Sequence, residues 1–165
     1  MKRETVFSPC RKYRYSLWRQ WDKSNPSFAL FIGLNPSTAD EVNDDPTLRR
    51  CLAFARKWGH GGLCLVNLFA FRAASPAVMQ QQADPVGPKN DTWIALWGKK
   101  ANRVVACWGI HGSFAERDKE VIPFLGKEIY CMGRTKSGQP RHPLYLKASQ
   151  RLQKFQPGQD GFQKK

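Results

Sequence analysis

Four short apolar segments, separated by helix-like patterns, constrain the fold more than any other feature of the chain. Continuous apolar runs of this length are typical of strands that are covered on both faces. Strands that alternate with helices predict an α/β fold, in which a central four-stranded parallel sheet is flanked by helices. The four segments are FALFIGL at 28–34, LCLVNLF at 63–69, RVVACWG at 103–109 and EIYCMG at 128–133.

Helical patterns occupy the intervals between these segments. After the first strand, Asp45 can cap a helix that begins at Pro46, and apolar side chains recur at helical spacing until Gly59. Two further helices are predicted near 89–101 and 113–125. The resulting order, in which each strand is followed by a helix, is the one that parallel strands with right-handed crossovers require.

The two ends of the chain differ from this core. Within 11–18 (RKYRYSLW), basic and polar side chains alternate with aromatic and apolar ones. This alternation predicts an extra N-terminal strand on the outside of the sheet, with Arg14 on a basic face in solvent. Residues 147–165 lose periodicity and gain Gln, Lys and Gly, so we expect one domain over 1–146 and a poorly ordered basic tail.

The chain is strongly basic. Lys and Arg number 27 against 13 Asp and Glu, which gives a formal charge of +14 and a pI near 9.9. A charge of this size favours a polyanionic partner, most simply DNA or RNA. The alternative is that the charge serves solubility alone.

Metal, disulfide and membrane signals are missing from the sequence. Its five Cys are an odd number without the short spacings of zinc or iron–sulfur sites, so they read as buried free thiols of a reducing cytosol. No apolar run of about 18 residues and no signal-peptide pattern occur. We expect a cytoplasmic monomer without metal or cofactor.

Ligands of open parallel sheets bind beyond the carboxyl ends of the strands. That rule selects the loops 35–47, 67–76 and 134–146. Asn67 interrupts an apolar strand, and a buried amide without partners would cost about 1–3 kcal/mol. Its partner is either a backbone neighbour or a ligand that offers one donor and one acceptor, as a nucleobase edge does.

The loop 134–146 gathers basic side chains around Gly138 and two prolines. Backbone amides and cations in such a loop can bind phosphate oxygens. The alternative is an ordinary solvated surface loop. The basic side chains are Arg134, Lys136 and Arg141.

Several long motifs resemble those of a known family. GLNPSTAD, DDPTLRR, VNLFAFRA, ADPVGPKND, WG and PRHPLY are similar to the family called domain of unknown function 1643. A more distant resemblance links the chain to the uracil-DNA glycosylase superfamily and implies its three-layer α/β fold. This resemblance rests on a Gly-x-(Asp or Asn)-Pro motif at 33–36, on Asn67 at the end of a strand, and on the late pair His142-Pro143.

The resemblance implies a DNA glycosylase acting on a flipped, damaged, deaminated or modified base. Cleavage of an N-glycosidic bond needs a positioned water and a donor for the departing base anion. By resemblance, Asn35 would hold the water, His142 would donate to the base carbonyl and Asn67 would read the base edge. The candidates for stacking on the base are Phe54, Phe69 and Phe71.

An Asn cannot act as a general base, so a nearby acid would have to assist Asn35. Asp40 and Asp44 follow the motif within one loop and are the first candidates, because Asp45 is explained as the helix cap. The alternative is a capping loop with solvated carboxylates. A metal-dependent nuclease is a further alternative, but the lack of His in this loop argues against it.

The remaining predicted residues would contact DNA. Leu144 and Tyr145 are the candidate wedge that holds the duplex open. Two other functions stay open, namely a catalytically inactive nucleic-acid-binding module of the same fold and a hydrolase or transferase of free nucleotides. The predicted phosphate contacts are Ser37, Thr38, Arg49, Arg134, Lys136 and Arg141.

Overall fold

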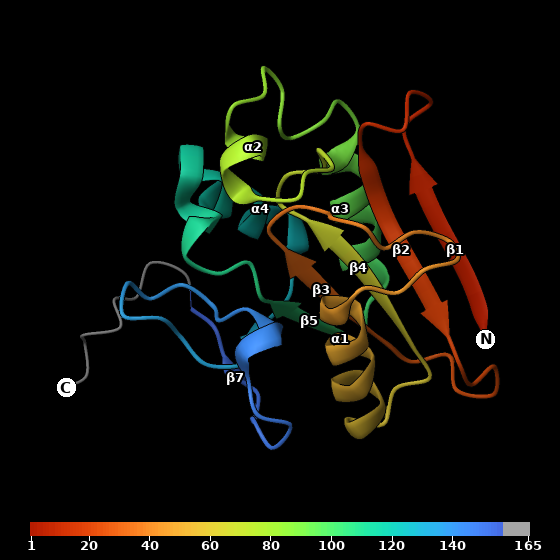
Figure 1. The fold of residues 1–165 in the computed structure, drawn as a ribbon. Helices are drawn as coiled ribbons and strands as arrows, with labels where there is room; N and C mark the ends of the chain where they lie inside the picture. The colour runs from red at the N-terminus through yellow and green to blue at the C-terminus, as the bar shows by residue number, and fades with distance from the viewer. Residues whose placement is uncertain (157–165) are drawn as a thin grey trace.

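The four predicted apolar segments form neighbouring strands at the centre of one sheet (Figure 1). In the computed structural model, which describes residues 1–156, they are β3 (Phe28–Gly33), β4 (Gly62–Asn67), β5 (Arg103–Ala106) and β6 (Ile129–Cys131). β3 pairs in parallel with both β4 and β5, and β5 pairs in parallel with β6. Their carboxyl ends therefore lie along one edge of the sheet.

Three antiparallel strands extend this centre on both sides. β1 (Lys2–Phe7) pairs with β2 (Arg14–Gln20), β2 pairs with β4, and β7 (Gln153–Lys154) pairs with β6. The strand order is β1-β2-β4-β3-β5-β6-β7. The α/β class is confirmed. The prediction of a four-stranded parallel sheet with one extra N-terminal strand is not confirmed, because the sheet that forms is mixed and has seven strands.

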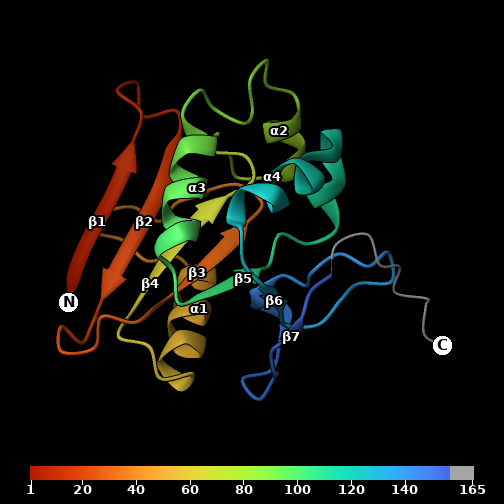
Figure 2. The ribbon, with the colours of Figure 1, turned by 180° about the vertical axis from the view of Figure 1, so that it is seen from behind.

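Helices cover both faces of the sheet. α1 (Pro46–Lys57) lies on the face turned to the viewer in Figure 1, and α3 (Asn90–Lys100) and α4 (Arg117–Leu125) pack together on the other face, seen in Figure 2. α2 (Pro76–Gln80) is a short helix after β4. Two 3₁₀ segments, Ile110–Glu116 and Pro143–Tyr145, complete the described structure.

Local signals set where these helices begin. The carboxylate of Asp45 accepts a hydrogen bond from the Leu48 N–H at 2.8 Å, and Pro46 occupies the first turn, as predicted for α1. The last helix begins at Arg117 instead of near residue 113, because Ala115 and Glu116 have φ values of 53° and 54° that interrupt the helical path.

The alternation of side chains along β3 divides the core into two layers. Phe31 packs on the α1 side with Leu63 and Leu65. Leu30 and Ile32 face the opposite layer, which contains α3 and α4 side chains. Both faces of β3 are thus apolar, which explains its unbroken apolar run.

The structure corrects the prediction for the N-terminal strand. β2 is an inner strand with β1 outside it, and the loop after β3 folds over it, so Arg14 is only 2% exposed. The predicted basic face in solvent is wrong for this residue. Alternation along a single strand could not reveal the neighbours that cover it.

The boundary at residue 146 is also too early. β7 falls within the predicted tail, and Phe155 is buried against the core. The rest of the predicted tail, 157–165, lies outside the described residues.

Four of the five cysteines are buried free thiols as predicted, whereas Cys10 is exposed. Within residues 1–156 no helix has the length and apolar character needed to cross a membrane.

Candidate functional site

A cavity of about 560 Å³ opens at the carboxyl ends of β3, β4 and β5. We call it the pocket. Its walls come from β2, the three strand ends, the start of α1 and three later segments, at 73–76, 108–111 and 142–145. Asn35, Asn67 and His142, which lie far apart in the sequence, all line it. The edge of the sheet that the strand directions predict is therefore the edge that is hollowed.

Asn35 follows β3 directly and its amide has a fixed orientation. The Nδ2 atom donates to the carbonyls of Ala73, at 3.0 Å, and Pro36, at 3.3 Å. These two bonds use both amide hydrogens. The Oδ1 atom is therefore the polar atom of Asn35 that remains to accept a hydrogen bond from water or a ligand.

Asn67 is the last residue of β4 and is 4% exposed. Its Oδ1 accepts a hydrogen bond from Nη2 of Arg14 at 3.3 Å, so the partner is a side chain and not the backbone neighbour considered from the sequence. Its backbone carbonyl accepts from Nδ2 of Asn90 at 2.9 Å. A Cβ at Gly33 would lie 2.9 Å from the Asn67 Nδ2, so this close approach requires glycine at 33.

His142 precedes the 3₁₀ turn Pro143–Tyr145 and caps it. Its Nδ1 accepts a hydrogen bond from the Leu144 N–H at 3.2 Å, so in the neutral ring the proton is on Nε2. Burial lowers the pKa of His142, with a smaller opposing effect of the Asp45 charge. At neutral pH His142 is thus an uncharged donor through Nε2.

Asp45 is the only carboxylate among the described residues that line the pocket. Its Oδ1 caps α1, and its Oδ2 accepts a hydrogen bond from the Ser37 hydroxyl at 3.0 Å. The sequence explained Asp45 as a cap alone. It is a cap, and its position at the start of α1 also brings its carboxylate to the pocket.

The two acids chosen from the sequence lie outside the pocket. Asp44 accepts hydrogen bonds from Arg3 and Arg19, both at 3.0 Å. Asp40 accepts from the N–H groups of Val42 and Asn43, which lowers the pKa of its carboxyl group. Asp40 orders its own loop and Asp44 ties that loop to β1 and β2, so their predicted role in activating water has no geometric support.

None of the phenylalanines predicted to stack on a base lines the pocket. Phe54 and Phe69 are buried in the core, and Phe71 packs edge-on against Tyr13. The aromatic wall is instead Trp108, whose Nε1 donates to Oε1 of Gln139 at 2.8 Å. The sequence signal for it was the Trp-Gly pair that ends an apolar strand.

Arg14 is the main pocket residue that the sequence analysis missed. Its Nη1 donates to the Ala39 carbonyl at 2.8 Å, and no carboxylate within residues 1–156 forms an ion pair with it. Burial lowers the pKa of this guanidinium to about 10. His111 and Cys107 also line the pocket without having been predicted.

The mouth of the pocket carries exposed apolar side chains. Leu144 and Tyr145, the predicted wedge, are 38% and 78% exposed, and Ile110 on the opposite loop is 58% exposed. Ser37 also lines the pocket. We call Ile110, Leu144 and Tyr145 the apolar rim. Large exposed apolar groups gathered at one opening are typical of a contact surface.

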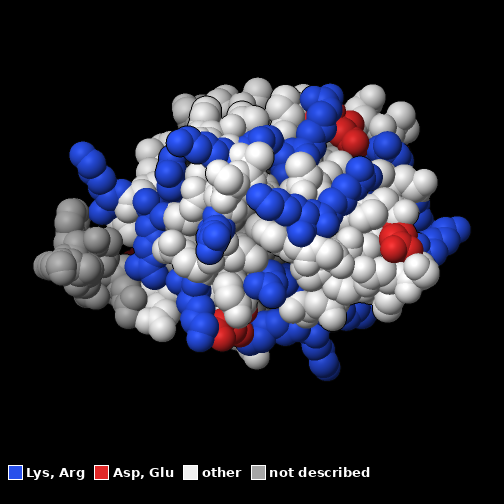
Figure 3. Space-filling model, turned by 90° about the horizontal axis from the view of Figure 1, so that it is seen from below, with Lys and Arg blue, Asp and Glu red and all other residues white. Residues whose placement is uncertain are grey.

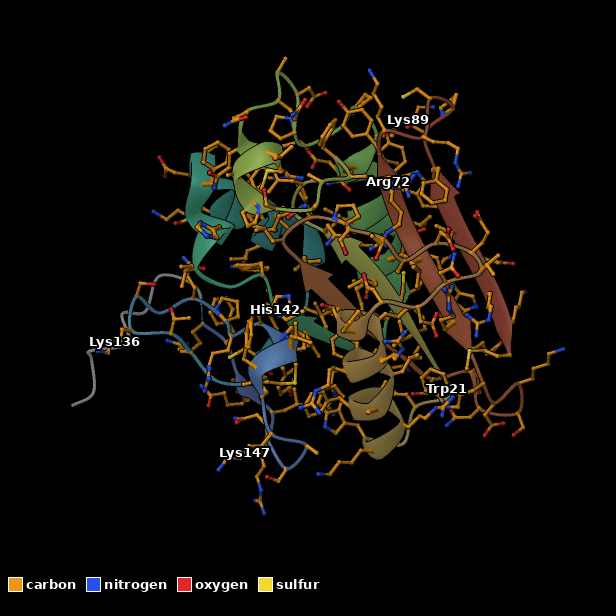
Figure 4. All side chains as sticks on the ribbon, in the orientation of Figure 1. Trp21, Arg72, Lys89, Lys136, His142 and Lys147 are labelled. Atoms are coloured by element: carbon orange, nitrogen blue, oxygen red, sulfur yellow. The ribbon has the colours of Figure 1, made fainter. Side chains whose placement is uncertain are left out.

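The predicted basic contacts lie outside the pocket lining. Figure 4 shows Lys136 at the outer end of the loop after β6, well away from His142. Arg134 lies over the Phe155 ring, 5.2 Å from its centre, and Arg49 donates to the Asp44 carbonyl. Thr38 and Arg141 are exposed.

Positive charge extends beyond this loop. The face in Figure 3 carries Lys and Arg side chains across its whole width, whereas Asp and Glu occupy isolated spots. The described residues contain no group of three or more metal-ligating side chains placed to hold an ion. The polar and charged side chains among the described pocket residues include Arg14, Asn35, Ser37, Asp45, Thr47, Asn67, His111 and His142.

Comparison with known proteins places the chain in a family. No curated protein and no solved structure matches it. Residues 14–144 match the family described as "Protein of unknown function (DUF1643)". This match spans every pocket residue named above except Tyr145. The chain belongs to the DUF1643 family.

Proposed function

We propose that this protein is a DNA glycosylase-like enzyme, with a fold of the uracil-DNA glycosylase type, that hydrolyses the N-glycosidic bond of a flipped damaged, deaminated or modified base. The observation that carries the proposal is the convergence of Asn35, Asn67 and His142 in one pocket. These are the three residues to which the motif resemblance gives separate roles, and the sequence places them on three different segments.

The water side of the reaction is built around Asn35. Its free Oδ1 can accept a hydrogen bond from the attacking water, since its Nδ2 is occupied by Ala73 and Pro36. Asp45 lines the same pocket and supplies the carboxylate that an Asn cannot replace as a proton acceptor. In this proposal, Asp45 takes the role that the sequence had suggested for Asp40 or Asp44.

The base side of the reaction is built around His142. As the glycosidic bond breaks, negative charge develops on the departing base, and a fixed donor aimed at that charge lowers the barrier. The Leu144 N–H occupies Nδ1 and leaves the proton on Nε2, so the neutral ring is a donor before the reaction begins. Burial keeps it neutral by lowering its pKa.

The apolar rim and the net charge support DNA as the substrate. A flipped base leaves a gap in the stack, which apolar side chains such as Leu144 and Tyr145 can fill. The formal charge of +14 favours the phosphate backbone. A nucleotide hydrolase receives less support, because the glycine-containing loop around Lys136 lies away from His142 (Figure 4).

A catalytically inactive DNA-binding module is the second candidate. It is favoured by one observation, namely that both oxygens of Asp45 already accept hydrogen bonds, from the Leu48 N–H and the Ser37 hydroxyl. Such a module would keep the pocket and the charge but leave the glycosidic bond intact.

The test is to incubate the protein with oligonucleotides that carry uracil, hypoxanthine, thymine opposite guanine, or hydroxymethylated and glucosylated pyrimidines. Alkali then cleaves any abasic site. We expect scission of one substrate, lost in Asn35→Ala and His142→Ala. His60→Ala is the matched control, because His60 bonds Ser27 and does not line the pocket. No scission, despite salt-sensitive DNA binding, would favour the inactive module.

A further inference from the structure

The amide of Asn67 is held in one orientation by Arg14. A guanidinium group has donors and no acceptor, so the Asn67 atom that it meets at 3.3 Å must be the oxygen. Arg14 cannot swing away freely, because it is buried and its Nη1 donates to the Ala39 carbonyl. The Nδ2 atom of Asn67 therefore faces the other way, toward Gly33, where an added Cβ would lie 2.9 Å from it.

This orientation makes the Nδ2 side of Asn67 the donor side, because Oδ1 is turned to Arg14. Asn67 and Gly33 both line the pocket, as does His142, whose Nε2 is also a donor. The hydrogen-bond acceptors are Oδ1 of Asn35 and the carboxylate of Asp45, which the proposed function assigns to the attacking water. A ligand that bonds the Asn67 Nδ2 must thus present a lone pair there, whereas the sequence analysis considered a ligand that offers one donor and one acceptor.

We infer that Arg14 is a specificity-determining residue that makes the pocket select a ring carbonyl or anionic oxygen over an amino group at the position facing Asn67. The inference rests on the proposed function, since it assumes that the pocket holds a base. An amino group at this position would set donor against donor and leave both without a partner. Such a mismatch costs at least about tenfold in affinity.

The charge of Arg14 adds to this selection. No carboxylate in the described part of the chain pairs with it, and its buried Nε has no hydrogen-bond partner there. The Asp45 charge offsets the burial of this cation only in part, so a further anion nearby is favoured. Negative charge that reaches the ligand oxygen is therefore stabilised through the polarised Asn67 amide.

Binding to bases that cannot be removed separates recognition from catalysis. We would measure the Kd of oligonucleotides whose target nucleotide carries a 2′-fluoro group, which slows glycosidic cleavage, in the pairs uracil against cytosine and hypoxanthine against adenine. An abasic analogue gives the baseline. For the wild type we expect the oxo member of at least one pair to bind about tenfold more tightly than its amino partner.

Variants at residue 14 test the role of Arg14. Arg14→Met removes the donors and frees the Asn67 amide to rotate, so the oxo-to-amino ratio should fall to about one. Arg14→Gln offers a smaller perturbation with the same expectation if the Met variant does not fold. Arg14→Lys should keep the preference, because an ammonium group also only donates. Arg19→Lys, at the other buried arginine of β2, should leave it unchanged.

The outcomes are distinct. A wild-type ratio retained in Arg14→Met or Arg14→Gln, or a wild-type preference for the amino bases, would overturn the role of Arg14 and leave the proposed function standing. Equal affinity for all four bases and the abasic analogue would overturn both.

Discussion

Two fully buried arginines on the same strand, β2, have opposite surroundings. Arg19 meets the Asp44 carboxylate at 3.0 Å, and Arg3 adds a second ion pair to the same acid. Arg14 meets only the Ala39 carbonyl and the Asn67 amide, and it lines the pocket. Arg19 is thus paired with an acid, whereas Arg14 forms no ion pair within residues 1–156, although the Asp45 charge acts on it.

We interpret this difference as a structural role for Arg19 and a functional role for Arg14. A buried charge that is paired and hydrogen-bonded is explained by the stability of the fold around it. A buried charge without a paired carboxylate costs desolvation energy that the Asp45 charge offsets only in part, and its lowered pKa of about 10 reflects that cost. Negative charge on a bound ligand would therefore stabilise Arg14, whereas Arg19 already has Asp44.

The largest effect on activity is expected from matched substitutions of two adjacent acids, Asp45 and Asp44. Asp45→Asn keeps the α1 cap, because Asn caps helices as well as Asp does, but removes the carboxylate from the pocket. We expect glycosylase activity to fall by about 10²- to 10⁴-fold. Asp44→Asn should retain activity. Alkali-cleavage rates measure both, and equal losses would contradict the assignment.

Unfolding measurements would sharpen the contrast between the two arginines. Arg19→Met leaves Asp44 with Arg3 alone and removes a bond to the Asp40 carbonyl, so we expect a loss of about 2–3 kcal/mol in the free energy of unfolding. Arg14→Met loses the bonds to Ala39 and Asn67 but also removes the desolvation cost of a buried charge without an ion pair, so the net loss should be about 1 kcal/mol or less. Urea titrations give both values, and a larger loss at Arg14 would reverse the interpretation.

The apolar rim provides a smaller effect. Tyr145→Ala removes the most exposed of the large apolar side chains beside the pocket, and we expect DNA affinity to fall about tenfold. Phe124→Ala is the control, because Phe124 is also an exposed apolar side chain but does not line the pocket. Fluorescence polarisation at fixed salt compares them. Equal losses would mean that general surface contacts, and not the rim, hold the DNA.

The smallest expected effect is the titration of His142. Its pKa is lowered by burial, so an NMR titration should place the midpoint below the ordinary value of about 6.5. As pH falls from that value through the lowered pKa, the unfolded chain binds the proton first and stability declines. Above this window the neutral ring is maintained. His142→Ala should remove its part of the decline, and His60, also with a lowered pKa, supplies another part.

Local patterns predicted the elements that depend on local physics. The apolar runs of β3 and β4 and the Asp45–Pro46 start of α1 are in the structure where the sequence indicated. β1 and β7 were missed because they are polar edge strands, with no apolar periodicity to mark them. Their formation depends on the neighbours that they pair with.

The same division holds for the pocket. Asn35, Asn67 and His142 could be predicted to converge because strand ends meet at one edge and because the motifs resemble a known pattern. Which acid faces the pocket could not, since the pairing of Asp44 with Arg19 depends on how β2 docks beside β4. Long-range pairing also explains why the sequence analysis wrongly predicted that Arg14 faces solvent.

The span of the pocket in the sequence has a consequence for how the protein is made. Its walls run from Arg14 to Tyr145, so a nascent chain that has already formed β2, β3 and β4 still lacks His142 and all three rim side chains. Synthesis must reach the last segment before the pocket closes. An incomplete chain can carry positive charge, but it does not hold the complete set of side chains that line the pocket.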